Sequence, residues 1–157
     1  MNLVKESLAR LLAQEDLIVE SRNVETAQFN VETRVLTLPN WKHETTVVDS
    51  LIAHEVGHAL YTPNEWGWQG TVPMQFVNVC EDIRIEKLMK RRYEGIPKTF
   101  FKGYKILADQ DFFQIEDRDL STFNLADRMN IHYKVGSFAQ VPFKDEEKQF
   151  LDKADKL

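Results

Sequence analysis

The sequence predicts an α+β fold, in which a small, mostly antiparallel sheet near the N-terminus packs against two long helices and a helical C-terminal part follows. Two observations support this prediction. Short runs of apolar and β-branched residues, bounded by turn residues, lie before Pro39. From Thr45 onward, apolar residues recur at helical spacing in long segments, so the predicted strands all precede a helical part of the chain.

Length, composition and charge restrict the class of protein. A chain of 157 residues with 43% hydrophobic residues can bury one core, so we expect a single domain over residues 1–157. The single cysteine, Cys80, excludes an internal disulfide and suits a reducing compartment. The formal net charge of −5 argues against nucleic acid as the main partner.

The N-terminus and the hydropathy of the chain indicate where the protein acts. The first residues, Met1–Glu6, include charges where a secretory signal needs an apolar run. No stretch of about 18 apolar residues could span a bilayer. We therefore expect a cytoplasmic protein without a membrane partner.

Short-range patterns predict the N-terminal elements. Leu3–Gln14 has apolar residues on one stripe and predicts an amphipathic helix. Leu17–Val19 predicts a short strand. Gln28–Val31 and Arg34–Leu38 predict a hairpin around residues 32 and 33, and a proline ends its second strand.

The next segment, Thr45–Tyr61, predicts a helix with apolar residues on most faces. Thr45 or Thr46 can supply the N-cap oxygen, and Pro63 marks the end of the helix. Such a helix is largely buried, so its histidines and its glutamate need polar or metal partners. Gly57 costs about 1 kcal/mol in a helix relative to alanine, which indicates that another element packs closely there.

This helix carries the most informative motif of the chain, His54-Glu55-Val56-Gly57-His58. Histidines four residues apart lie on one helix face, so both imidazoles can bind one metal ion. Glu55 then lies beside an open coordination position, where it can take a proton from metal-bound water. The motif predicts one Zn²⁺ per chain, bound by His54 and His58, with Glu55 as general base. Two unrelated histidines on a surface helix are the alternative.

A second predicted helix, Val72–Arg92, offers the third ligand. Its acidic residues lie among apolar neighbours, so a solvated helix face explains them poorly. Glu81 is our first candidate, and Asp82 is its rival because Glu86, one turn further on, can then orient a ligand histidine. An intrahelical network of salt bridges on a half-exposed helix is the alternative. The candidates for contacts with the ligands are Asn78, Arg84 and Glu86.

The C-terminal third of the chain is helical. Thr99–Gln110 and Thr122–Val135 show helical spacing, and Lys144–Leu157 predicts a charged, amphipathic terminal helix. Hydrolysis of a carbonyl substrate also needs a donor that stabilises the oxyanion, a role that histidine and tyrosine commonly fill. The candidates for this donor, each with a structural role as its alternative, are Tyr61, His132 and Tyr133.

Other residues near the predicted site have two interpretations each. Cys80 is either a soft metal ligand or, as we prefer, a small buried apolar residue. The basic run Lys87–Arg92 either complements the helix dipole, our preferred interpretation, or binds a partner. His43 is a candidate site residue or a solvated loop residue. Trp66 and Trp68 either form part of a substrate pocket or anchor their loop.

Two sets of residues carry a resemblance to a known family, namely His54-Glu55-x-Gly57-His58-x-Leu60-x-Thr62-Pro63 and Asn78-x-x-Glu81-Asp82-x-Arg84-Ile85-Glu86. Over residues 27–92 the chain resembles the zincin-type, gluzincin-like metallopeptidase domains encoded by large tailed phages. It is also similar to the metallopeptidase-like domains that accompany von Willebrand A-type modules, including relatives of the cobaltochelatase large subunit. The resemblance implies a zincin-like fold with His54 and His58 as zinc ligands and Glu55 as general base.

The resemblance also has implications for substrate and partners. In zincins a strand along the cleft pairs with an extended substrate, and the candidates here are Val35, Leu36, Thr37 and Leu38. The chain is then a stand-alone version of such a domain or the N-terminal part of a longer protein, with a possible partner domain of von Willebrand A type. A phage-encoded chain acts in the host cytoplasm.

These features together predict a zinc-dependent peptidase that hydrolyses a peptide or protein substrate through water activated by Glu55. The alternative is a catalytically silent, zincin-shaped module that binds peptide or regulates a partner and holds zinc for structural reasons. Hydrolysis of a non-peptide amide or ester is a third hypothesis. Substitution of Glu55 distinguishes the first two.

Overall fold

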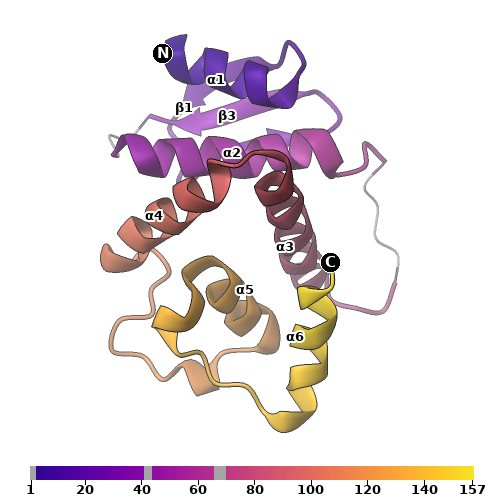
Figure 1. Ribbon diagram of the computed structural model, residues 1–157, viewed down its shortest axis with the longest axis vertical. Helices are drawn as coiled ribbons and strands as arrows, with labels where there is room; N and C mark the ends of the chain where they lie inside the picture. Colours follow the sequence, from indigo (N-terminus) through magenta and orange to yellow (C-terminus); the bar gives the residue numbers. More distant parts are fainter. Residues whose placement is uncertain (1–2, 41–43, 66–69) are drawn as a thin grey trace.

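The computed structural model describes residues 3–40, 44–65 and 70–157 (Figure 1). Its elements are α1 (Leu3–Ala13), β1 (Ile18–Arg22), β2 (Gln28–Asn30), β3 (Val35–Pro39), α2 (Thr45–Tyr61), α3 (Met74–Arg92), α4 (Ile96–Asp109), α5 (Leu125–Val135) and α6 (Lys148–Asp155). Short 3₁₀ turns are η1 (Leu120–Thr122), η2 (Gly136–Ala139) and η3 (Asp145–Glu147). The predicted α+β class is confirmed. His43, Trp66 and Trp68 lie outside the described residues.

The sheet has the order β1-β3-β2, and its connectivity differs from the prediction in one respect. The expected hairpin is confirmed, because β2 pairs antiparallel with β3. However, β1 pairs parallel with β3, so the sheet is mixed and the expectation of a mostly antiparallel sheet is wrong. The physical reason is burial. Leu36 and Leu38 of β3 are buried, and a central position covers them better than an edge would.

Helix α2 is the central element of the molecule (Figure 1). It lies against α1 and the sheet on one side and meets α3 and α4 on the other, so Val47, Ile52 and Val56 are fully buried. The helix begins after Glu44, which makes no side-chain capping hydrogen bond, so the predicted cap by Thr45 or Thr46 is wrong. Both threonines already lie inside the first turn.

Two glycines allow the helices to approach α2 closely. A Cβ atom on Gly57 would lie 2.7 Å from Ile85 Cδ1 of α3, which confirms that another element packs closely at this position. A Cβ atom on Gly103 of α4 would lie 2.2 Å from Ser50 Oγ. These contacts fix the distance at which α3 and α4 cross α2, and thereby the distance between the motif and its neighbours.

Helix α3 joins two clusters of buried apolar residues. Met89 belongs to the cluster around α1, the sheet, α2 and α4, whereas Val79 and Ile83 pack with residues of α5 and α6. The basic run at the end of α3 contacts the C-terminal segment, because Lys87 Nζ donates to the carbonyl oxygens of residues 154 and 155. In the part of the chain that the structure describes, no helix has the length and hydropathy needed to cross a membrane.

Candidate metal centre

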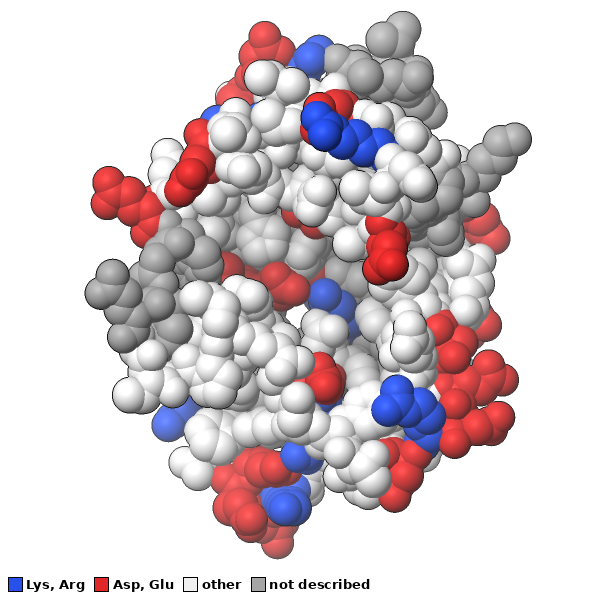
Figure 2. Space-filling model, turned by 180° about the vertical axis from the view of Figure 1, so that it is seen from behind, with Lys and Arg blue, Asp and Glu red and all other residues white. Residues whose placement is uncertain are grey.

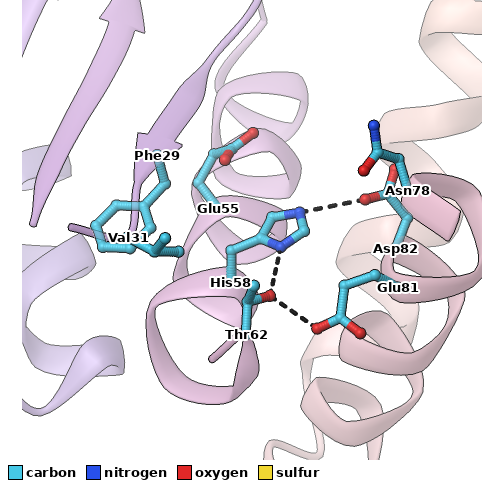
Figure 3. A pocket seen from close by; sticks show the side chains of 8 residues that line it. All are labelled: Phe29, Val31, Glu55, His58, Thr62, Asn78, Glu81 and Asp82. Atoms are coloured by element: carbon cyan, nitrogen blue, oxygen red, sulfur yellow. Dashed lines mark hydrogen bonds and ion pairs between the residues drawn. The ribbon is translucent and has the colours of Figure 1, made fainter. Parts of the chain in front are cut away.

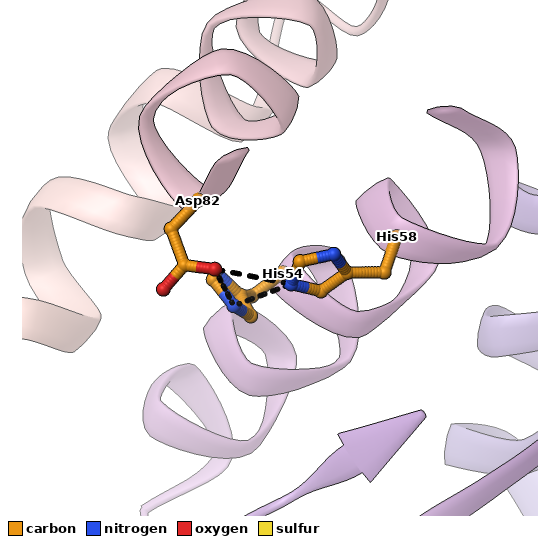
Figure 4. Close-up of side chains that lie close together, drawn as sticks. All are labelled: His54, His58 and Asp82. Carbon is orange, nitrogen blue, oxygen red and sulfur yellow. Dashed lines mark hydrogen bonds and ion pairs between the residues drawn. The ribbon is translucent and has the colours of Figure 1, made fainter. Parts of the chain in front are cut away.

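Three side chains from two helices meet where α2 crosses α3 (Figure 4). The Nε2 atoms of His54 and His58 lie 3.3 Å apart. Asp82 Oδ1 lies 3.2 Å from Nε2 of His58 and 3.6 Å from Nε2 of His54. The two histidines are on one face of α2 because they are four residues apart, and Asp82 reaches them from α3. All three side chains are mostly buried.

The other ring nitrogen of each histidine is held by a hydrogen-bond partner. His54 Nδ1 lies 2.7 Å from Glu86 Oε1, and Tyr104 Oη donates to the same carboxylate oxygen. His58 Nδ1 lies 2.8 Å from Thr62 Oγ1. Burial raises the pKa of Tyr104, and so do the charge and hydrogen bond of Glu86, so the phenol remains a donor.

This network assigns the tautomer of both imidazoles. The hydroxyl of Thr62 donates to Glu81 Oε1 at 2.8 Å, so its oxygen accepts the Nδ1 hydrogen of His58. Glu86 is an acceptor for His54 in the same way. In the neutral form of each ring the lone pair is then on Nε2, which faces the space shared with Asp82 Oδ1. Lone pairs aimed at one point favour a cation at that point.

The spacing of the three atoms fits a small tetrahedral ion. Ligand bonds of 2.0–2.1 Å in a tetrahedron place the ligand atoms about 3.3–3.4 Å apart. The observed separations of 3.2, 3.3 and 3.6 Å surround that value. Two imidazoles and one carboxylate are a donor set that zinc accepts, and three protein ligands leave one position for water or substrate. The residues present therefore fit Zn²⁺.

Glu55 lines a pocket beside this group (Figure 3). The pocket has a volume of about 330 Å³, and its other walls are formed by Phe29, Val31, His58, Thr62, Asn78, Glu81 and Asp82. Burial raises the pKa of Glu55, which makes its carboxylate a stronger base than a solvated one. Seen from the side opposite to that of Figure 1, the surface has a hollow near its middle (Figure 2). Acidic and basic side chains lie at the walls of this hollow.

Charges around the group hold Asp82 in its ionised form. Burial alone would raise the pKa of this carboxyl, but the hydrogen bond of His58 and the charges of His54 and Lys134 lower it far below its usual range. Burial acts to lower the pKa of His54, but the hydrogen bond to Glu86 and the charge of Asp82 outweigh it, so the pKa of His54 is raised.

The structure brings Asp82, and not Glu81, to the histidines, contrary to our preference for Glu81. The carboxylate of Glu81 is turned along α3, where Arg84 Nε and Nη2 donate to it at 2.8 and 2.7 Å. Arg84 also donates to the carbonyl oxygen of Tyr61 at the end of α2. Glu81 accepts a hydrogen bond from Thr62, which in turn pairs with His58 Nδ1. It therefore supports His58 from behind and is not brought to the Nε2 atoms.

The three candidate oxyanion donors do not lie at the group. Tyr61 Oη accepts a 3.4 Å hydrogen bond from Arg92. His132 packs its ring against Tyr133 and against a phenylalanine of the C-terminal segment. Tyr133 Oη lies 2.8 Å from Asp155 Oδ1 and 3.1 Å from the carbonyl oxygen of residue 151, so it ties α5 to α6.

The proposed substrate strand is also placed differently. Val35, Leu36 and Thr37 pair with β1 on one side and with β2 on the other, so their backbone groups cannot pair with a substrate. Leu38 is paired with β1 and is buried. The strand next to the pocket is β2, since Phe29 lines it. Arg34 holds this hairpin on α2 through a 2.7 Å hydrogen bond to the carbonyl oxygen of residue 59.

Sequence reasoning gave no role to three residues of the network around the group. Thr62 stands four residues after His58, and this spacing was a usable signal. Tyr104 and Lys134 come from α4 and α5, and no local pattern links them to the motif. Of the remaining candidates, Asn78 lines the pocket, and Cys80 is half-buried outside the group of possible metal ligands.

Comparisons with known proteins give no further assignment. No family model matches the chain, and neither the curated proteins nor the solved structures include a match.

Proposed function

We propose that this protein is a zinc-dependent peptidase with His54, His58 and Asp82 as zinc ligands. The observation that supports this most directly is the convergence of three ligand atoms at tetrahedral spacing, with both Nδ1 atoms already held by hydrogen-bond partners. The position of Glu55 beside the group, in a pocket that Phe29 and Val31 also line, adds a base next to the open coordination position. The resemblance of the two motifs to zincin peptidases agrees with this function.

In the proposed reaction, the base, the residues behind the histidines and the neighbouring strand have separate roles. When bound, zinc supplies a Lewis acid that polarises a carbonyl group and lowers the pKa of water to about 7. Glu55 accepts the proton of the attacking water and transfers it to the leaving amine. Glu86 and Thr62 keep the imidazoles in the tautomer that leaves Nε2 free. Because β2 is an outer strand of the described sheet and Phe29 lines the pocket, β2 is the candidate strand for backbone pairing with an extended peptide.

The test is substitution of the base with the metal ligands left intact. Glu55→Gln keeps the size of the side chain and removes its basicity, so we expect kcat/KM for peptide cleavage to fall by about 10²–10⁴-fold. Zinc content by elemental analysis and far-UV circular dichroism are expected to stay unchanged. The matched control is Glu146→Gln, because Glu146 is exposed and lies in η3, away from the pocket.

The outcomes separate the two hypotheses. Cleavage of a peptide library by the zinc-loaded protein, and its loss in Glu55→Gln alone, supports the peptidase. A protein that retains one zinc per chain but cleaves no member of the library is instead a silent peptide-binding or regulatory module. A protein that retains no zinc after exposure to excess metal contradicts both.

A further inference from the structure

Lys134 of α5 approaches Asp82 at its other carboxylate oxygen. Its ammonium group lies 3.3 Å from Oδ2, whereas Oδ1 is the atom that faces the two histidines. The two oxygens of one carboxylate therefore have different partners. An acceptor that is already engaged by an ammonium group is a poor ligand for a second cation.

The surroundings of Lys134 keep the ammonium group in this position. Its side chain is 17% exposed, and Nζ lies 5.9 Å from the centre of the Tyr104 ring. Tyr104 is itself held by its hydrogen bond to Glu86, the carboxylate behind His54. The lysine is thus fixed between the aromatic ring and Asp82, and both of these neighbours belong to the network of the candidate metal centre.

We propose that Lys134 is a positioning residue that restricts Asp82 to a single metal-binding oxygen. This inference depends on the metal centre of the proposed function and concerns its coordination number. With Oδ2 held by Lys134, the chain offers three single-atom ligands and the metal keeps an open position. With Oδ2 released, the aspartate can bind through both oxygens and fill that position.

The restriction gives the centre a preference among metals. Zinc accepts four ligands that include nitrogen, whereas Mn²⁺ and Mg²⁺ favour octahedral sites rich in oxygen. A carboxylate that binds through both oxygens raises the number of ligands and the share of oxygen among them. The centre then becomes more suitable for Mn²⁺ and Mg²⁺. Lys134 thereby favours zinc over manganese, although its charge opposes the binding of either dication to the same degree.

The experiment compares Lys134→Met with the wild-type chain, using Co²⁺ as a spectroscopic probe and Zn²⁺ and Mn²⁺ in competition titrations. We expect wild-type protein to show the intense visible absorption of four-coordinate Co²⁺ and Lys134→Met to lose it. We also expect the ratio of zinc affinity to manganese affinity to fall by about 10-fold or more, within the 10–100-fold range of changes around metal ligands. The ratio is used because the loss of one positive charge affects both dications equally.

Three further variants complete the design. Lys134→Arg keeps a cationic donor and is expected to retain the four-coordinate spectrum. Lys105→Met removes a lysine of α4 that lies over the Phe138 ring, away from Asp82, and serves as the matched control. Lys134→Ala repeats the loss of the donor if the methionine variant does not fold, with folding followed by circular dichroism.

The experiment measures metal binding and not peptide cleavage. Failure of this inference can therefore be told apart from failure of the proposed function. A wild-type chain that binds no metal contradicts the metal centre itself. A wild-type chain that gives the four-coordinate spectrum, with Lys134→Met giving the same spectrum and the same affinity ratio, overturns the role of Lys134. Loss of the spectrum in Lys134→Met and its recovery in Lys134→Arg support that role.

Discussion

At the scale of single residues, one hydrogen bond to each histidine determines which ring nitrogen is free. Glu86 and Thr62 occupy the two Nδ1 atoms, and both Nε2 atoms then face Asp82. The spacing of His54, Glu55 and His58 on one helix was sufficient to predict that the imidazoles lie together. The sequence also allowed the prediction that Glu86 orients a ligand histidine, for the case in which Asp82 is the third ligand.

The sequence could not decide between Glu81 and Asp82. Adjacent residues on a helix point about 100° apart, so the choice depends on how α3 is rotated about its axis. That rotation is set by the packing of Ile85 against Gly57 and of Val79 and Ile83 against the C-terminal helices. These are contacts between distant parts of the chain, and a local pattern does not contain them.

The two acidic neighbours can be distinguished by mutation. We expect Asp82→Asn to lower zinc affinity by more than the 10–100-fold typical of residues that only support a ligand, because it removes a charged ligand. Glu81→Gln leaves all three ligand atoms in place and is expected to fall within that range of about 10–100-fold. Competition of both variants with a chelator measures the difference. A larger loss in Glu81→Gln than in Asp82→Asn would contradict the assignment.

At the scale of elements, helix bounds were predicted within a few residues, whereas the order of the strands was not. The periodic apolar pattern of Thr45–Tyr61 and the punctuation by proline are local signals, and α2 begins and ends at the predicted residues. Strand order depends on which strand buries most surface against the helices. β3 takes the centre for that reason, and the candidate substrate strand was misplaced as a consequence.

The connection between α5 and η3 makes the C-terminal part sensitive to acid. Arg128 donates to both carboxylate oxygens of Glu147 at 2.6 and 2.7 Å. These hydrogen bonds, and then the backbone N–H of Lys144, lower the pKa of Glu147 to about 2 from an ordinary value of 4.5. A carboxyl whose pKa is lowered by folding stabilises the fold above its unfolded pKa. This stabilisation is lost as the pH falls from about 4.5 toward 2.

We therefore expect Glu147→Gln to lower the free energy of unfolding at neutral pH. The difference from wild type is expected to shrink as the pH falls from about 4.5 to 2, since the wild-type carboxyl is then protonated as well. Urea unfolding of both proteins across this range gives the difference directly. Glu146→Gln in the same turn is the control, and a difference for Glu147→Gln that does not vary with pH would refute the interpretation.

At the scale of the whole molecule, the candidate centre lies where two buried clusters meet. The histidines belong to α2, which is part of the cluster around the sheet, and Asp82 belongs to α3, which also packs with α5 and α6. A ligand that binds the folded chain and not the unfolded one stabilises it in proportion to the logarithm of its concentration. A metal ion bound here would connect the two clusters.

We therefore expect zinc to stabilise the protein as a whole. At a free zinc concentration of 100 times Kd, the gain in unfolding free energy is about 2.7 kcal/mol if the unfolded chain has no affinity for zinc. Calorimetric unfolding with zinc and with a chelator measures this gain. His54→Ala is expected to remove it, while His132→Ala is expected to keep it because His132 packs between aromatic rings. An equal gain in His54→Ala would contradict the assigned ligands.

The chain of hydrogen bonds from His58 through Thr62 and Glu81 to Arg84 has an evolutionary consequence. The carboxylate of Glu81 is buried, so the loss of its partners would leave an unpaired charge in the interior. Replacement of one member therefore weakens the contacts of the others, so we expect selection to act on them together. In any set of chains descended from a common ancestor with this one, we expect positions 62, 81 and 84 to be inherited as a unit, and this co-inheritance would identify its relatives more specifically than the five-residue motif.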